Sequence, residues 1–134
     1  MDVANNFDDF IGIKMIGFVD DHYVVELEVA PKHLNPAGIV HGGVLCTMLD
    51  TAMAKAFFET LPKEKQLGAA LELKINFLRP TEAGKLTAYG KLVNPTKRTA
   101  FVEGYILNQQ GKLVAKASAT IMLSVKITGE GKQI

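Results

Sequence analysis

Asp50 carries the side chain best placed for chemistry, because it is a carboxylate on the one long helix that this 134-residue chain predicts. Apolar residues from Leu45 to Phe57 recur at intervals of three and four, which is the spacing of an apolar stripe along one side of an α-helix. Asp50 lies off that stripe, on the side that carries Thr47, Thr51 and Ala54. It is therefore the first candidate for a reacting group.

A second candidate is the triplet His41-Gly42-Gly43, which stands immediately before the helix. The first backbone N–H groups of a helix have no partner within it, and the positive end of the helix dipole lies there. Such an end favours an anion or a developing oxyanion. The simpler interpretation of Gly42 is a glycine needed for a tight turn into the helix, and the two interpretations are compatible.

These two features are too far apart to serve one reacting group within a single chain. His41 and Asp50 are nine positions apart in the sequence, which corresponds to about 13 Å along a helix axis. A base and an oxyanion donor must both lie about 3 Å from the reacting group. If both act, the helix start of one copy must meet Asp50 of another, so the sequence predicts an active site shared across a homodimer interface.

Composition limits the classes of protein and partner. With 48% hydrophobic and 22% charged residues, the chain fits one soluble domain, residues 1–134. A net charge of +1 provides no basic field for nucleic acid or an anionic membrane, so small molecules and other proteins remain as partners. No apolar run reaches membrane-span length, and the N-terminus does not resemble a signal peptide. We therefore expect a cytoplasmic protein.

Cysteine and histidine give no metal-binding pattern. Cys46 is the only cysteine, which excludes an intrachain disulfide, and we interpret it as a small core residue rather than a reactive thiol. His22 and His33 stand alone in the sequence and are expected at the surface. The three dispersed histidines lack metal-ligand spacing, so no metal site is predicted.

The order of elements predicts an α+β fold with a meandering antiparallel sheet. Two strands and a loop precede the helix, which ends near Pro62, and four strands follow it. The expected strands are residues 13–19, 23–29, 69–77, 84–92, 99–107 and 113–125, with a short amphipathic helical turn at 3–10 and a turn at Asn94-Pro95.

One face of the last three strands carries unusually small side chains. This allows the sheet to curl closely around a bulky helix, although an ordinary twisted sheet would also accept them. The residues concerned are Ala88, Gly90, Ala100, Gly104, Ala115, Ala117 and Ala119.

Together these features resemble a known family. A strand hairpin precedes a loop and helix with the pattern Asn35, Pro36, Gly38, His41, Gly42, Gly43 and Asp50, and the segments INFLRP (75–80) and TKRTAFVEG (96–104) follow. The pattern is similar to that of the hotdog-fold acyl-CoA thioesterases of the PaaI type. The resemblance implies a curved antiparallel sheet wrapped around one central helix. It also implies hydrolysis of an aromatic or medium-chain acyl-CoA, with no cofactor besides the CoA of the substrate.

The resemblance also assigns roles at the site. Asp50 would be the catalytic base or nucleophile, and Gly42 would donate its N–H to the oxyanion. His41 would bond the thioester carbonyl or hold the loop. Asn35 would orient the partner's carboxylate or the water, with an Asx turn before Pro36 as the structural alternative. Asp50 as an ordinary helix aspartate also remains open.

For the substrate's CoA, relatives use comparable loop residues, which here are Lys97, Arg98 and Thr99, with Arg79 as a further cation. A solvated turn is the alternative. Some relatives carry a serine or threonine that positions water where this chain has Ala70. The family pattern further implies a homodimer, with two such dimers forming a homotetramer.

Two other functions remain open: an acyl-thioester hydratase or dehydratase, and a non-catalytic acyl-CoA binding module. HGGVLC does not match the histidine loops typical of the hydratases, and Asp50 disfavours the binding module. The acyl group would be bounded by apolar residues, among them Phe7, Phe10, Phe57, Phe58 and Leu61.

Overall fold

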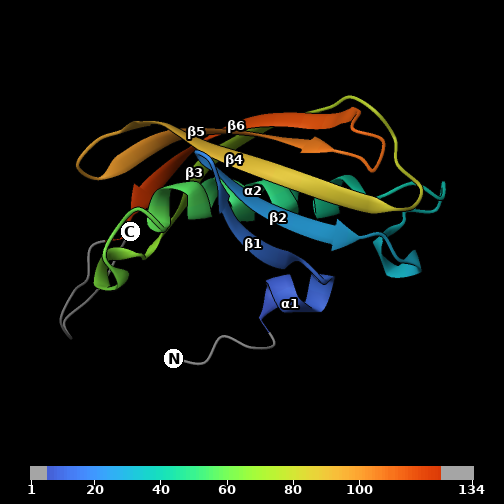
Figure 1. Cartoon of the computed structure of the whole chain (residues 1–134), viewed down its shortest axis with the longest axis horizontal. Coiled ribbons are helices and arrows are strands. Elements are labelled where there is room, and N and C mark those ends of the chain that lie inside the picture. Colours follow the sequence, from blue (N-terminus) through green and yellow to red (C-terminus); the bar gives the residue numbers. More distant parts are fainter. Residues whose placement is uncertain (1–5, 125–134) are drawn as a thin grey trace.

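The structure is a computed structural model, and it describes residues 6–124. A six-stranded antiparallel sheet curves over the long helix α2 (Figure 1). In chain order the elements are α1 (Phe7–Ile11), β1 (Lys14–Val19), β2 (His22–Glu28), the 3-10 helix η1 (Pro31–His33), α2 (Gly42–Phe58), the 3-10 helix η2 (Lys63–Lys65), β3 (Gly68–Phe77), β4 (Lys85–Pro95), β5 (Thr99–Leu107) and β6 (Leu113–Leu123). The α+β class and the hotdog architecture are confirmed.

Helix α2 forms where the apolar periodicity predicts it. His41 is its N-cap, and the His41 Nδ1 accepts a hydrogen bond of 2.9 Å from the Gly43 N–H. The side chains of the apolar stripe face the sheet and form the centre of the core; the buried helix residues are Val44, Leu45, Met48, Leu49, Ala52, Met53, Ala56 and Phe57.

The strand order β1-β2-β4-β5-β6-β3 differs from the predicted meander. The pairs β1–β2, β4–β5 and β5–β6 follow the sequence order, whereas β3 pairs antiparallel with β6 at the far edge. The reason is that β2 already occupies the side of β4 that β3 would need. The segment 78–84 therefore carries the chain across the sheet, and β3 becomes an edge strand.

The wrapped-helix interpretation of the small residues is confirmed, since Ala88, Gly90, Ala100, Gly104, Ala115, Ala117 and Ala119 are all buried. A Cβ on Gly90 would clash with the backbone of Ala52, and one on Gly104 would lie 3.0 Å from the Met53 side chain. The sheet thus approaches α2 more closely than side chains would permit.

Several local expectations need correction. Strand β4 continues through Asn94 and Pro95, because a register shift after Leu92 pairs Pro95 with Ala100, and the turn falls at residues 96–98. The N-terminal helical turn is α1, which begins at Phe7 with Asn6 as its N-cap; residues 3–5 of the predicted range lie outside the described residues, as does Val125 of the last predicted strand.

The prediction that His33 is a surface residue is wrong. Its side chain is 3% exposed, its Nδ1 accepts from the Ala30 N–H at 2.9 Å, and its Nε2 lies 2.6 Å from the Ile11 carbonyl oxygen. Because Nδ1 is an acceptor, the ring proton lies on Nε2 and is donated to Ile11. His33 therefore ties the end of α1 to the loop before α2.

His22 is half-buried rather than fully exposed. Its ring meets those of Tyr89 and Tyr105 edge-on at centroid distances of 6.1 and 5.8 Å.

Within residues 6–124, no helix has the length and apolar character needed to cross a membrane.

Replacing Gly90 with alanine tests the close approach of sheet and helix. The new methyl group would meet the Ala52 backbone, which cannot rotate away, so we expect the free energy of unfolding to fall by about 1–3 kcal/mol. Denaturant titration measures the change. Lys91→Ala, at an exposed position next in the strand, is the control and should change the value by about 0.5 kcal/mol or less. Equal stability of Gly90→Ala and the parent would contradict the tight packing.

Candidate active site

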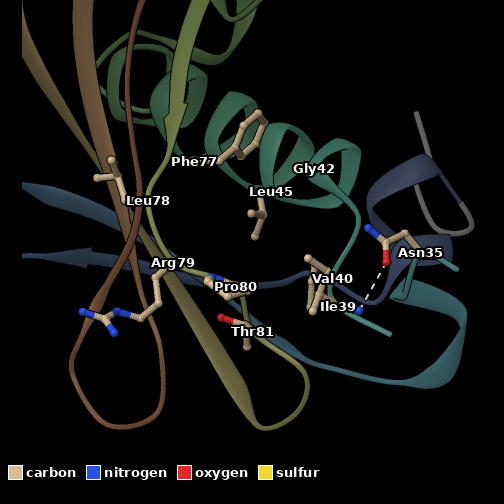
Figure 2. A pocket seen from close by; sticks show the side chains of 10 residues that line it. All are labelled: Asn35, Ile39, Val40, Gly42, Leu45, Phe77, Leu78, Arg79, Pro80 and Thr81. Atoms are coloured by element: carbon tan, nitrogen blue, oxygen red, sulfur yellow. Dashed lines mark hydrogen bonds between the residues drawn. The ribbon is translucent and has the colours of Figure 1, made fainter. Parts of the chain in front are cut away.

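A pocket of about 470 Å³ lies at the start of α2 (Figure 2). Its walls come from three segments: the loop before the helix, the first turn of the helix, and the chain that leaves β3. Most of its surface is apolar, with polar groups from Asn35, Arg79 and Thr81. The lining residues are Asn35, Ile39, Val40, Gly42, Leu45, Phe77, Leu78, Arg79, Pro80 and Thr81.

The Gly42 N–H is the unused donor at this helix start. Gly43 donates to the His41 side chain, and Val44 donates to the His41 carbonyl oxygen at 2.9 Å. The Gly42 N–H makes no hydrogen bond to any residue of the described range 6–124. A Cβ on residue 42 would lie 3.1 Å from the Phe77 ring. Gly42 has no positive φ, so the turn into the helix does not itself require glycine; the closeness of the Phe77 ring favours glycine instead, and the N–H is a free backbone donor.

His41 is exposed and does not line the pocket. Its Nδ1 is occupied as an acceptor from Gly43, so the ring proton lies on Nε2, which faces away from the cap bond. The structure therefore shows that His41 holds the helix start. Its predicted contact with the thioester carbonyl stays a prediction.

Asn35 combines both alternatives that the sequence left open. Its Oδ1 accepts from the Ala37 N–H at 2.9 Å and from the Ile39 N–H at 3.3 Å, which is an Asx turn. This leaves the side-chain NH₂ group as a donor on a residue that lines the pocket. Figure 2 shows the bond that holds Asn35 to Ile39.

Thr81 is a pocket residue that the sequence analysis did not single out. Its side chain is 8% exposed, and its Oγ1 is buried without a hydrogen-bond partner among residues 6–124. Its backbone carbonyl accepts from the Val40 N–H at 2.8 Å, so it fastens the loop before α2 to the chain after β3. No feature of its sequence neighbourhood signals this role, because it depends on where β3 ends.

Asp50 lies in a different pocket, of about 340 Å³, on the outer side of α2. Burial raises the pKa of the Asp50 carboxyl, and the nearby negative charge of Asp8 raises it further. The carboxylate nevertheless reaches the surface of the single chain. The lining residues are Phe7, Asp8, Cys46, Thr47, Asp50, Thr51 and Leu73.

Cys46 belongs to this pocket rather than to the core, which corrects our interpretation of it. Its side chain is half-buried, and it lies one helical turn before Asp50. Burial raises the pKa of the Cys46 thiol, and the charge of Asp50 raises it further. The thiol therefore stays protonated near neutral pH, where it is a poor nucleophile.

The two pockets lie along the same edge strand. Phe77 borders the pocket of Gly42, and Leu73 borders the pocket of Asp50. Both side chains face the helix, four residues apart on β3, which is about 13 Å. Within one chain the Gly42 N–H and the Asp50 carboxylate are thus separate, as the sequence predicts.

The predicted CoA-binding cations do not lie together within one chain. Arg79 lines the Gly42 pocket, and its N–H donates to Val114 at 3.1 Å. The carbonyl of Arg98 accepts a hydrogen bond from the Leu123 N–H, at the other end of β6. Val114 and Leu123 are nine residues apart on this strand, which is about 30 Å. Lys97 is exposed at the same turn, whereas the Thr99 hydroxyl is already bonded to Thr96 at 2.8 Å.

Three other expectations can be placed. Phe7 lines the Asp50 pocket, whereas Phe57 is 2% exposed, lies in the core and lines neither this pocket nor that of Gly42, so its contact with the acyl group stays a prediction. Ala70 is half-buried on β3 and offers no hydroxyl at that position. Among the described residues, no cluster of three His, Cys, Asp or Glu side chains has an arrangement suited to a metal ion.

Comparison with known proteins now adds to this geometry. The family model of the thioesterase superfamily matches residues 37–115, which include the end of the loop before α2, all of α2 and the strands from β3 to the start of β6. The chain belongs to the thioesterase superfamily. Its PaaI-type character is shown by the acyl-coenzyme A thioesterase PaaI of Escherichia coli, to which it is 35% identical over 78% of this chain and 73% of that protein.

Two solved structures and a further relative are also similar to this chain. The Escherichia coli PaaI structure superposes with a TM-score of 0.78 at 32% identity, covering 87% of this chain and 82% of that one. A Bacillus halodurans protein solved with CoA gives a TM-score of 0.71 at 32% identity, covering 75% and 66%. The 1,4-dihydroxy-2-naphthoyl-CoA hydrolase of Listeria monocytogenes is 31% identical over 87% of this chain and 94% of its own. This member of the superfamily is a thioester hydrolase.

Proposed function

We propose that this thioesterase hydrolyses an aromatic or medium-chain acyl-CoA to the free acid and CoA, at a site that two copies of the chain form together. The observation that carries the proposal is the division of the site. A free Gly42 N–H and the Asp50 carboxylate lie in separate pockets that border one edge strand. A second copy pairing along that strand would complete both.

The edge of β3 supports this pairing. Beyond β6, β3 has no neighbouring strand among residues 6–124, and its large apolar side chains Leu71 and Phe77 are more than half exposed. Unpaired strand edges of this kind readily add another strand. In an antiparallel pair with a two-fold axis near Ile75, Leu73 of one protomer would face Phe77 of the other. The Asp50 pocket of each protomer would then adjoin the Gly42 pocket of its partner.

The same pairing would bring the cations together. With that axis the Gly68 end of one β3 strand would extend past the Phe77 end of the other, toward the segment that follows it, and Arg98 lies at the Gly68 end through the contact of both segments with Leu123. Lys97 and Arg98 of one protomer would thus approach Arg79 of the other. Three cations at the pocket mouth would suit the phosphates of CoA. By family resemblance, two such dimers would form a tetramer.

The chemistry follows from the two groups. As substrate binds, the Gly42 N–H would donate to the thioester oxygen, where negative charge builds in the transition state. Asp50 would either remove a proton from the attacking water or attack the carbonyl carbon itself, after which water releases the acid. The carbon–sulfur bond breaks in either route, and CoA leaves. Asn35, with its NH₂ group free, would orient the water or the carboxylate.

Two features bear on the acyl group and on the alternatives. Phe7 and Leu73 make the Asp50 pocket partly apolar, and the Listeria relative is named for an aromatic acyl-CoA, which favours an aromatic group.

A partly desolvated carboxylate with a raised pKa is the state expected of a base. This favours hydrolysis over a binding module. A hydratase would need a catalytic histidine, and the Nδ1 of His41 is occupied by the helix cap.

Asp50→Asn tests the central role. Asparagine keeps the size of the side chain but removes the charge, while the Gly42 N–H and the binding contacts remain. We expect kcat to fall by on the order of 10²–10⁴, with little change in KM or in oligomeric state. A panel of acyl-CoAs, with thiol release as the readout, measures this and ranks the acyl groups. A folded variant with the parental rate would exclude Asp50 as the base or nucleophile.

Gly42→Pro tests whether the site is shared between protomers. Residue 42 is the first of the helix, where proline is tolerated and only the unused N–H is lost, so kcat should fall by on the order of 10²–10³. Gly42→Ala is the matched control, since it places the same Cβ against Phe77 but keeps the N–H. Co-expressed Gly42→Pro and Asp50→Asn chains should regain activity, because each mixed dimer contains one intact site. No recovery in isolated mixed dimers would place both groups within one chain.

Lys97 and Arg98 are tested by replacing both with alanine. If they contact the nucleotide part of CoA, KM for acyl-CoA should rise, while a short pantetheine thioester without the nucleotide should be hydrolysed as before. Lys63→Ala with Lys65→Ala removes two exposed charges from η2 and serves as the control for net charge. An equal loss on both substrates would assign Lys97 and Arg98 a structural role.

A further inference from the structure

Helix α1 forms one wall of the Asp50 pocket. Phe7 and Asp8 from this short helix line the pocket opposite Leu73 of β3. The helix itself is well bounded, since the Asn6 side chain accepts from the Asp9 N–H at 3.0 Å and Gly12 ends it in the left-handed conformation, with φ of 96°. Asp8 therefore occupies a defined place beside the candidate reacting group.

Three side chains fasten α1 there. His33, which is buried, donates to the Ile11 carbonyl, and the Lys32 ammonium donates to the Phe10 carbonyl at 3.0 Å. These two bonds satisfy carbonyl groups that a helix end leaves free. The third bond joins the helix to α2: the Thr51 hydroxyl donates to the Asp8 Oδ1 at 2.9 Å. Thr51 follows Asp50 directly in the sequence, so this bond holds the Asp8 carboxylate next to Asp50.

We propose that Asp8 is a positioning residue for the thioesterase reaction, whose carboxylate, held by Thr51, keeps a negative charge beside Asp50 and makes Asp50 a stronger base. This inference rests on the proposed role of Asp50. It assigns a function to α1, which is otherwise a small helix outside the sheet.

Within one chain, Asp8 is the charged group that faces Asp50 in this pocket. From α2 the pocket receives the Cys46 thiol, which is neutral, and the hydroxyls of Thr47 and Thr51; from β3 it receives only the apolar Leu73. No cation lines the pocket in the part of the chain that the structure describes. A nearby negative charge disfavours ionisation of Asp50, which adds to the effect of burial and raises the pKa. A base with a higher pKa accepts a proton from water more readily.

Asp8→Asn tests this role through the pH dependence of kcat/KM for the best acyl-CoA. Asparagine has the same shape, and its amide oxygen can still accept from Thr51, so α1 should stay in place. Removing the charge lowers the pKa of Asp50. We therefore expect the acidic limb of the profile to move to lower pH, and the plateau value to fall far less than in Asp50→Asn. Asp9→Asn, on the same helix but outside the pocket, should leave the limb where it is.

Two variants of Thr51 separate the charge from its fastening. Thr51→Val releases Asp8 without changing any charge, so the acidic limb should move in the same direction by a smaller amount. Thr51→Ser keeps the hydroxyl and should behave like the parent. A merely structural role of Asp8 would lower stability and rate at all pH values without moving the limb. These variants also test the inference if Asp8→Asn fails to fold.

The outcomes distinguish this inference from the proposed function. An acidic limb that stays in place, or moves to higher pH, in folded Asp8→Asn or Thr51→Val would overturn the role of Asp8. If Asp50→Asn is then inactive, the proposed function of Asp50 still stands. If Asp50→Asn keeps the parental rate, both fail together.

Discussion

The close approach of the sheet to the backbone of α2 is the constraint on which the rest of this structure depends. Gly90 lies against the Ala52 backbone, and Gly104 lies against the Met53 and Leu49 side chains, so the concave face of the sheet holds the helix at a short distance. Because close-packed interiors leave little freedom to shift, this contact fixes the helix along its length. The position of the Gly42 end and the position of Asp50 are both consequences of it. Residues that never touch substrate thus determine where chemistry can occur.

The pairing of β3 with β6 places an edge strand beside α2, next to both pockets. Strand β3 leaves its neighbour in sequence and pairs with β6, which puts Leu73 and Phe77 at an open edge beside α2. One strand therefore borders both pockets, and its free edge is where a second copy can bind. The segment 78–84, which crosses the sheet after β3, contains Arg79 and Thr81, and both line the Gly42 pocket. Oligomer formation and catalysis are linked through this single strand in the function that we propose.

Some polar groups around α2 make hydrogen bonds that hold the fold, whereas others are left without a partner in the described part of the chain. The Nδ1 of His41 and the Oδ1 of Asn35 are used to hold the backbone at the helix start, whereas the Gly42 N–H and the Asn35 NH₂ remain unused. On the outer side of the helix, Thr51 holds Asp8, and Asp50 is left next to it with a raised pKa. Fixed neighbours of this kind keep a reacting group in place without reorganisation during the reaction.

The sequence by itself determined most of the secondary structure, the central helix and the separation of Gly42 from Asp50 within one chain. These follow from local periodicity, from glycine placement and from the rise of a helix, none of which needs tertiary contacts. Small residues on alternate positions likewise predicted the wrapped sheet. The strand order, the burial of His33, the exposure of Cys46 to a pocket and the roles of Thr81 and Asp8 were decided only by the tertiary structure. Each depends on which segments meet across long stretches of chain, and the position of β3 at the far edge follows from β2 already occupying the side of β4. Local sequence patterns do not predict which strands pair with each other, because the pairing depends on how the whole sheet packs on α2.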